Sequence, residues 1–340
     1  MFERIAIMGA GSLGTILGAY LGRAGKDVTL VDPYEAHVKA LNEVGATVVG
    51  KADFTAPVKA CTPADMDGNY DLFIYMAKQT YNETALPQMV AHCHENTIIC
   101  CCQNGVPEMA VAKYWPADKI CGAPIGWGAT FKGPGVSELT SDEASCTNHL
   151  GAYDGKEHEW LKEVQAVLEC MCPTELTNYL MVNRWTKVAI NASFSGLSTV
   201  IGGTFGDVMD DPIGIQCLAM IINEVHRVTA AEGIPLAPFA GLDFGGLGGF
   251  TDAEGKAKLE DAIRTLLVPH RALVASMLQD LRKGQKCEIA QIDGVVAELG
   301  DKHGIDTPFT DMVIEIVGGY EAGNGAPCIE SIQKFASLLQ

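Results

Sequence analysis

A chain of 340 residues is long enough for two domains of ordinary size, and its 48% of apolar residues excludes a largely disordered protein. The formal net charge of −18 argues against nucleic acid and anionic membranes as partners. There is no run of about 18 apolar residues that would span a membrane, and glycine interrupts the first apolar residues too soon for a signal peptide. We therefore expect a cytoplasmic protein.

The first segment predicts a strand, a glycine turn, a helix and a second strand. Residues 4–8 form a short apolar run that leads directly into Gly9-Ala10-Gly11-Ser12-Leu13-Gly14. Apolar side chains then recur at helical spacing up to residue 24, and Gly25 predicts the end of that helix. Residues 27–32 predict the second strand.

The glycine turn has the composition of a dinucleotide-binding turn. Gly9 permits a tight turn, Gly11 lets the backbone approach a pyrophosphate, and Gly14 lets the helix pack closely on the sheet. The N-terminus of the helix supplies unpaired N–H groups and the positive end of a dipole. We therefore expect the whole segment to bind a dinucleotide, with Ser12 and Leu13 among its contacts.

An acidic residue ends the second predicted strand. Asp32 follows Gly14 by 18 residues, where a carboxylate would hold the ribose hydroxyls of the adenosine and repel a 2′-phosphate. NAD(H) is therefore favoured. NADP(H) stays open as the alternative, because His37 and Lys39 follow closely enough in the sequence to reach a phosphate.

Two further strands are predicted at residues 71–76 and 97–102, and a polar cluster follows each of them. The clusters are Lys78-Gln79-Thr80 and Gln103-Asn104-Gly105. Ligands of open α/β sheets bind beyond the carboxyl ends of the strands, so we expect both clusters to line the cofactor cleft. Residues 120–123 and 135–139 predict later strands with some antiparallel pairing.

The 12 cysteines do not indicate a disulfide framework or a metal site. Disulfides are uncommon in a chain of this length without an export signal. Cys100, Cys101 and Cys102 belong to a predicted buried strand, whereas Cys170 and Cys172 lack the usual spacing of zinc ligands. We assign no metal.

Helical patterns replace strand patterns from about residue 179 onward. Helices are predicted over roughly 179–201, 212–232, 253–283 and 288–303. The glycine-rich segment 239–249 predicts a loop, which is either a mobile lid or a plain connection. We predict an α/β fold with an N-terminal Rossmann-type dinucleotide-binding domain (1–178) and a C-terminal all-helical domain for substrate binding and dimerisation (179–340).

The first of these helices carries a polar line. Lys187, Asn191 and Ser195 are spaced by four residues, so on a helix they lie along one face. Their neighbours are largely apolar, and a buried lysine is costly unless it faces a partner or a cavity. From periodicity alone, a lysine in a cleft and an ordinary exposed lysine are equally well supported.

Five motifs together resemble the ketopantoate reductase (2-dehydropantoate 2-reductase) family over nearly the whole chain. In chain order they are Gly9-x-Gly11-x-x-Gly14, Gln103-Asn104-Gly105, Lys187-Val188-Ala189-Ile190-Asn191, Ser276-Met277-Leu278-Gln279-Asp280, and Glu288-Ile289 with Asp293-Gly294. The resemblance implies a nicotinamide-dependent oxidoreductase that acts on the CH–OH group of a 2-hydroxy acid, with a role in pantothenate biosynthesis.

The resemblance also implies the roles of single residues. Lys187 would be the catalytic lysine that donates a proton to the keto oxygen, and Glu288 its acidic partner, in contact with substrate and cofactor. The implied substrate contacts are Asn104, Asn191, Ser195 and Ser276. Besides the glycine turn and Asp32, the implied cofactor contacts are Lys78, Gln103, Asn104 and Glu288.

Two positions depart from the family pattern. Ser195 stands where ketopantoate reductases usually carry a second asparagine, and Asp32 stands where many members have basic or neutral residues for NADP(H). We expect reduction of a branched 2-keto acid, with ketopantoate to pantoate as the leading case. The alternatives are an NAD-dependent D-2-hydroxyacid dehydrogenase for another bulky 2-keto acid, a non-catalytic dinucleotide sensor, and an opine-type or imino-acid reductase. A homodimer is also open.

Overall fold

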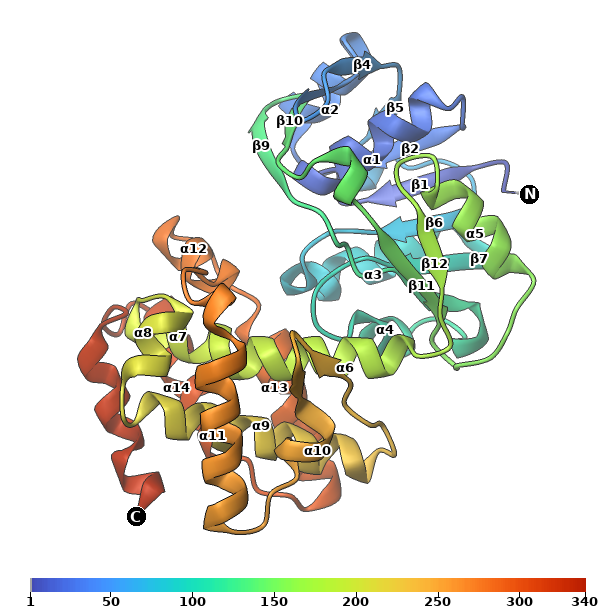
Figure 1. The fold of residues 1–340 in the computed structure, drawn as a ribbon. Helices are drawn as coiled ribbons and strands as arrows, with labels where there is room; N and C mark the ends of the chain where they lie inside the picture. The colour runs from blue at the N-terminus through green and yellow to red at the C-terminus, as the bar shows by residue number, and fades with distance from the viewer. Residues whose placement is uncertain (1) are drawn as a thin grey trace. The chain divides into compact units, whose positions relative to one another are not determined.

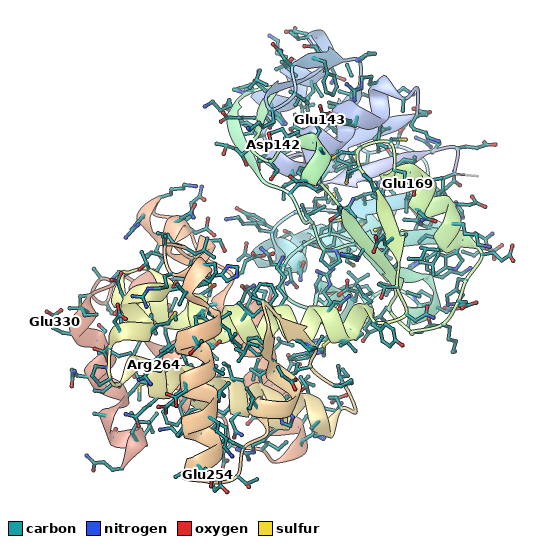
Figure 2. The ribbon with its side chains drawn as sticks, viewed as in Figure 1. Asp142, Glu143, Glu169, Glu254, Arg264 and Glu330 are labelled. Carbon is teal, nitrogen blue, oxygen red and sulfur yellow. The ribbon has the colours of Figure 1, made fainter. Side chains whose placement is uncertain are left out.

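The computed structural model describes residues 2–340, and the chain divides into two compact units after Leu180 (Figure 1). This division falls two residues beyond the expected boundary at residue 178. Within the described residues, no helix is both long enough and apolar enough to cross a membrane. The labelled acids Glu169, Glu254 and Glu330 are exposed side chains of the two units, in keeping with the negative net charge (Figure 2).

The first unit is built on an eight-stranded sheet with the order β12-β11-β8-β7-β6-β1-β2-β5. The six neighbouring strands β5, β2, β1, β6, β7 and β8 are parallel to one another, and β11 pairs antiparallel with β8. The bounds of these strands are β1 (Ile5–Met8), β2 (Val28–Val31), β5 (Lys59–Cys61), β6 (Tyr70–Tyr75), β7 (Cys93–Cys101), β8 (Ile120–Gly122), β11 (Asn148–Ala152) and β12 (Thr174–Leu176).

Helix α1 (Ser12–Arg23) is covered by a second, four-stranded sheet with the order β4-β3-β10-β9. One face of α1 packs on the main sheet and another contacts β3, β9 and β10, so the helix is buried from Gly14 to Leu21. The bounds are β3 (Ala46–Gly50), β4 (Phe54–Ala56), β9 (Ala129–Gly133) and β10 (Val136–Leu139). The other helices of this unit are α2 (Glu35–Glu43), α3 (Asn82–Val90), α4 (Pro107–Val111) and α5 (Trp160–Leu168).

The strands that the sequence predicts are present, and the fold class is confirmed. The order of the parallel strands changes direction at β1, because β2 pairs with one edge of β1 and β6 with the other. Such a switch point is where open α/β sheets bind their ligands. The antiparallel pairing predicted for the later strands is found between β9 and β10 and between β8 and β11.

The second unit is helical and is centred on α9 (Gly214–Ala231), which contacts α8, α10, α11, α13 and α14. The bounds of the other helices are α6 (Leu180–Ile190), the π-helical turn η5 (Asn191–Ser195), α7 (Gly196–Ile201), α8 (Phe205–Asp210), α10 (Phe244–Gly248), α11 (Ala253–Leu266), η6 (Val268–His270), α12 (Ser276–Arg282), α13 (Ile289–His303), α14 (Pro308–Glu321) and η7 (Ile329–Leu339).

Two predictions for the second unit are wrong. The helix expected over 253–283 ends at Leu266 and resumes only at Ser276. Pro269 lies between these ends, and proline lacks the N–H that a continuous helix needs. The loop expected over 239–249 instead contains a short hairpin and α10, because Leu242 and Phe244 are fully buried and fix the segment.

A buried glutamate joins α9 to α14. The carboxylate of Glu224 accepts hydrogen bonds from the backbone N–H groups of Phe309 and Thr310, each at 2.9 Å, and from the Thr310 hydroxyl at 2.7 Å. It thereby satisfies donors at the start of α14. Burial raises the pKa of Glu224 to about 7 despite these hydrogen bonds.

Candidate active site

The three glycines of the first turn differ in the space around them. Gly9 has a φ of +101°, and a Cβ there would lie 2.3 Å from the backbone nitrogen of Ala77. A Cβ on Gly14 would lie 2.2 Å from the carbonyl oxygen of Gly9, whereas a Cβ on Gly11 would meet nothing within 4 Å. Gly9 and Gly14 are therefore required by the fold itself, and Gly11 leaves open space above the turn.

The carbonyl of Ala10 holds the turn in place. It accepts hydrogen bonds from the Thr15 hydroxyl and from Nε2 of His37, both at 2.8 Å. Nδ1 of His37 in turn accepts the backbone N–H of Gly135 at 2.8 Å. His37 is buried, so it cannot serve as the phosphate contact that its place in the sequence allowed.

The N-terminus of α1 fits an anionic ligand. No side chain caps the helix at Gly11, and its first turn contains no acidic residue. Unpaired N–H groups and the helix dipole therefore face the open space at Gly11. These features match the pyrophosphate of a dinucleotide better than a purely structural turn.

The end of β2 carries an acidic side chain. Asp32 follows β2 directly, is partly exposed, and accepts the backbone N–H of Tyr34 at 3.0 Å. Lys39, the other residue whose place in the sequence allowed contact with a phosphate, is exposed, and its Nζ lies 3.8 Å from Oε1 of Glu43 in an ion pair.

The two polar clusters predicted for the cofactor cleft lie side by side. Ala77 donates its backbone N–H to the carbonyl of Met8 at the end of β1, at 2.9 Å. The side chain of Gln79 donates to the carbonyl of Asn104 at 2.7 Å. The segments that follow β1, β6 and β7 therefore meet at one edge of the sheet, and this edge includes Lys78 and the buried Gln103.

In the second unit, the predicted polar line occupies one continuous helical stretch with an irregular turn. Lys187 lies on α6, and Asn191 to Ser195 form a π-helical turn, which the sequence did not predict. The hydroxyl of Ser195 donates to Oδ1 of Asn191 at 3.5 Å, so these two side chains face each other. π-Helical turns are rare and often occur at functional sites.

The charge of Lys187 is poorly solvated. Burial lowers its pKa, the nearby charge of Arg184 lowers it further, and the carboxylate of Glu288 partly opposes both effects. Arg184 is itself 1% exposed, and Glu288 precedes α13 and is 8% exposed. Arg184 was missed in the sequence, although its position one turn before Lys187 in an apolar helix was a usable signal.

The remaining predicted substrate residue starts α12. Ser276 is exposed at the first position of that helix, and α12 contacts both η5 and α7. Ser276 therefore lies on an element that packs against the turn bearing Asn191 and Ser195, while Asn104 belongs to the first unit.

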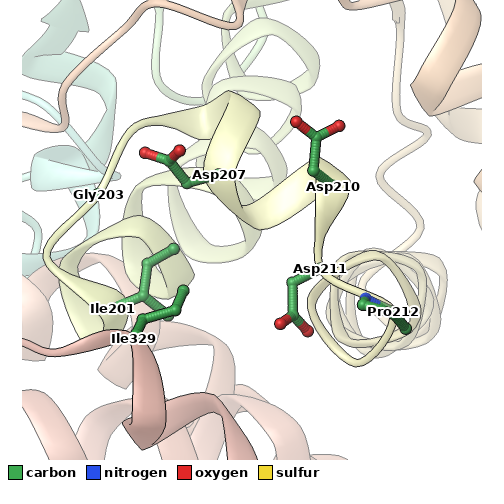
Figure 3. A pocket seen from close by; sticks show the side chains of 7 residues that line it. All are labelled: Ile201, Gly203, Asp207, Asp210, Asp211, Pro212 and Ile329. Atoms are coloured by element: carbon green, nitrogen blue, oxygen red, sulfur yellow. The ribbon is translucent and has the colours of Figure 1, made fainter.

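One hollow in the helical unit is lined by three aspartates and does not fit an acid substrate (Figure 3). Its three aspartates are engaged in local structure. Asp207 accepts from the backbone and hydroxyl of Thr204, Asp211 accepts the N–H groups of residues 213 and 214 at 2.8 Å, and Asp210 pairs with Arg271. These carboxylates would repel a keto acid anion.

Comparison with known proteins places both units in one family. Residues 5–154 match the family model described as ketopantoate reductase PanE/ApbA, and residues 180–321 match its C-terminal model. The 2-dehydropantoate 2-reductase of Streptococcus pyogenes is 25% identical over 94% of this chain and 98% of its own length. That of Lactococcus lactis is 26% identical over the same shares of both chains.

Solved structures give the same result. The 2-dehydropantoate 2-reductase of Geobacter metallireducens is 26% identical with a TM-score of 0.72, covering 93% of this chain and 99% of that one. A complex of D-mandelate dehydrogenase with NADH is 25% identical with a TM-score of 0.74, and the match covers 95% of this chain and 100% of that one. The chain therefore belongs to the ketopantoate reductase family, whose members are pyridine-nucleotide oxidoreductases that act on a CH–OH group.

Proposed function

We propose that this protein reduces a branched 2-keto acid to the 2-hydroxy acid, with Lys187 as the proton donor. The observation that carries the proposal is the half-buried, poorly solvated lysine on α6, aligned with Asn191 and Ser195 and within electrostatic reach of Glu288. Poorly solvated charges of this kind are costly and cluster at functional sites.

The environment of Lys187 suits the reduction. A nicotinamide bound by the first unit would supply a hydride to the keto carbon, and negative charge would then develop on the keto oxygen. An ammonium group stabilises that charge and donates its proton to the alkoxide. Because its pKa is lowered, Lys187 releases the proton more readily than an exposed lysine would. Glu288 acts in the opposite direction and favours the protonated form of Lys187, which is the form that can serve as the acid.

We assign the dinucleotide to the first unit. The open space at Gly11, the uncapped start of α1 and the edge that bears Lys78, Gln103 and Asn104 would hold its pyrophosphate and nicotinamide halves. Asp32 favours NAD(H), because a carboxylate repels the 2′-phosphate of NADP(H). The engagement of His37 in buried hydrogen bonds supports the same choice.

The leading substrate is ketopantoate, which would give pantoate. A second candidate is another bulky branched 2-keto acid, reduced with NADH. Two observations favour this second candidate: the serine at position 195 in place of the asparagine expected for ketopantoate, and the similarity to a D-mandelate dehydrogenase that binds NADH.

Lys187→Ala tests the proposal. We expect turnover of every keto acid to fall by about 1000-fold or more, since general acid catalysis and charge stabilisation both end, while NADH binding is retained. The measurements are NADH oxidation with a panel of keto acids and NADH binding by fluorescence. Lys283→Ala, at an exposed lysine, is the control. If the unmodified protein binds NADH but reduces no keto acid, a non-catalytic sensor replaces the proposal. An absolute requirement for an amine would indicate an imino-acid reductase.

A further inference from the structure

A small apolar hollow lies beside η5 in the helical unit. Its lining includes Ile190 and Phe194 from α6 and η5, Phe205 and Met209 from α8, and His270 and Leu273 from η6 and the segment after it. Almost all of the exposed lining is carbon, and its volume is about 50 Å³. This is about a third of an engineered apolar cavity of about 150 Å³ that takes up benzene. The size therefore suits a branched alkyl group.

The hollow adjoins the polar line of the candidate site. Ile190 and Phe194 immediately precede Asn191 and Ser195 in the sequence. Three residues on an α-helix turn through about 300°, so Ile190 lies only about 60° around the axis from Lys187. The apolar wall and the polar line are thus neighbouring faces of one helical stretch.

The part of the lining formed by Phe205 and Leu273 is fixed by backbone hydrogen bonds. Phe205 donates its N–H to the carbonyl of Leu273 at 3.0 Å, and Gly206 donates to the carbonyl of Arg271 at 2.8 Å. A Cβ on Gly206 would lie 3.1 Å from that carbonyl oxygen, so a larger residue would crowd this close approach. This part of the lining also ends near the candidate site, because Ser276 lies three residues beyond Leu273.

We propose that this hollow is the subsite for the branched alkyl side chain of the keto acid. The inference rests on the proposed function, narrows its substrate class to branched aliphatic 2-keto acids, and favours the second candidate substrate over ketopantoate. His270 also lines the hollow, but almost none of the exposed lining is polar, so a hydroxyl placed among these carbon atoms would be poorly hydrogen-bonded, which is unfavourable. The subsite therefore favours a side chain without a hydroxyl over the same side chain with one.

A pair of substrates isolates the effect of the hydroxyl. 3,3-Dimethyl-2-oxobutanoate and ketopantoate differ only in a hydroxyl group at the end of the branched side chain. We expect kcat/KM to be higher for 3,3-dimethyl-2-oxobutanoate by about 10-fold or more, and to exceed that of pyruvate by at least as much. Equal values for all three acids would overturn the subsite.

A matched pair of leucines tests the place of the subsite. Leu273 is 49% exposed and lines the hollow, whereas Leu266 is 38% exposed and does not line it. Leu273→Trp should narrow the hollow and lower the ratio of kcat/KM for the dimethyl acid to that for pyruvate by about 10-fold. Leu266→Trp should leave this ratio unchanged. Thermal unfolding of both variants checks that each is folded.

A second variant changes the hollow in the opposite direction. Phe239, which also lines it, is 40% exposed, and Phe239→Ala should raise activity on phenylglyoxylate relative to the dimethyl acid by several-fold. If the enzyme reduces keto acids but neither substitution alters side-chain preference, the subsite is refuted and the proposed function stands. If no keto acid is reduced at all, the proposed function fails and the subsite with it.

Discussion

Gly11 offers a direct test of where the dinucleotide binds. The residue has a φ of −62°, and a Cβ would meet nothing within 4 Å, so Gly11→Ala should change the free energy of unfolding by no more than about 0.5 kcal/mol. The added methyl group would nevertheless occupy the space of a pyrophosphate oxygen. Moving the pyrophosphate away from two backbone N–H donors removes about 3 kcal/mol, at about 1.5 kcal/mol each. This corresponds to a Kd for NADH raised by roughly 100-fold.

Gly14→Ala is the contrasting control. Its Cβ would lie 2.2 Å from the carbonyl oxygen of Gly9, so this substitution should destabilise the protein with or without NADH. NADH titration by fluorescence and thermal unfolding without ligand separate the two effects. If the Gly11→Ala variant binds NADH as tightly as the unmodified protein, the pyrophosphate does not lie over Gly11, and this assignment is wrong.

Two further predictions concern cofactor choice and stability. Asp32→Ser should raise the ratio of kcat/KM for NADPH to that for NADH by about 10-fold, because it removes the charge opposing the 2′-phosphate. Burial raises the pKa of Glu224 from 4.5 to about 7. The protonated carboxyl should therefore contribute about 3 kcal/mol to the free energy of unfolding below pH 4.5, and this contribution should be lost as the pH rises through 7. In thermal unfolding at a series of pH values, Glu224→Gln should flatten this part of the profile, and an unchanged slope would contradict the assignment.

The N-terminal turn was predictable because its determinants are local. The apolar run before Gly9, the helical spacing after Gly14 and the acid at Asp32 all lie within one short segment. The four-stranded sheet was not predictable in the same way. Its central pairing joins Thr47 to Val136, and no local pattern specifies a partner at that separation.

In the helical unit, too, some features were predictable from local sequence patterns and others were not. The spacing of Lys187, Asn191 and Ser195 placed them on one face, and the hydrogen bond between the last two confirms that they face each other. The π-helical turn beneath them was not predicted, because sequence periodicity at this length does not distinguish 3.6 residues per turn from a wider turn. The break at Pro269 was a local signal that the prediction underweighted.

The electrostatics of α6 favour one of the two interpretations of Lys187 that periodicity left equal. An ordinary surface lysine would be solvated, yet burial lowers the pKa of this one and Arg184 adds a second positive charge nearby. Desolvation and the nearby charge of Arg184 both oppose the charged form of Lys187, which is unfavourable for stability alone. Glu288 offsets part of this effect on Lys187. A proton donor for a developing alkoxide, by contrast, benefits from a poorly solvated ammonium group held beside a carboxylate, and this is the role that we propose for Lys187.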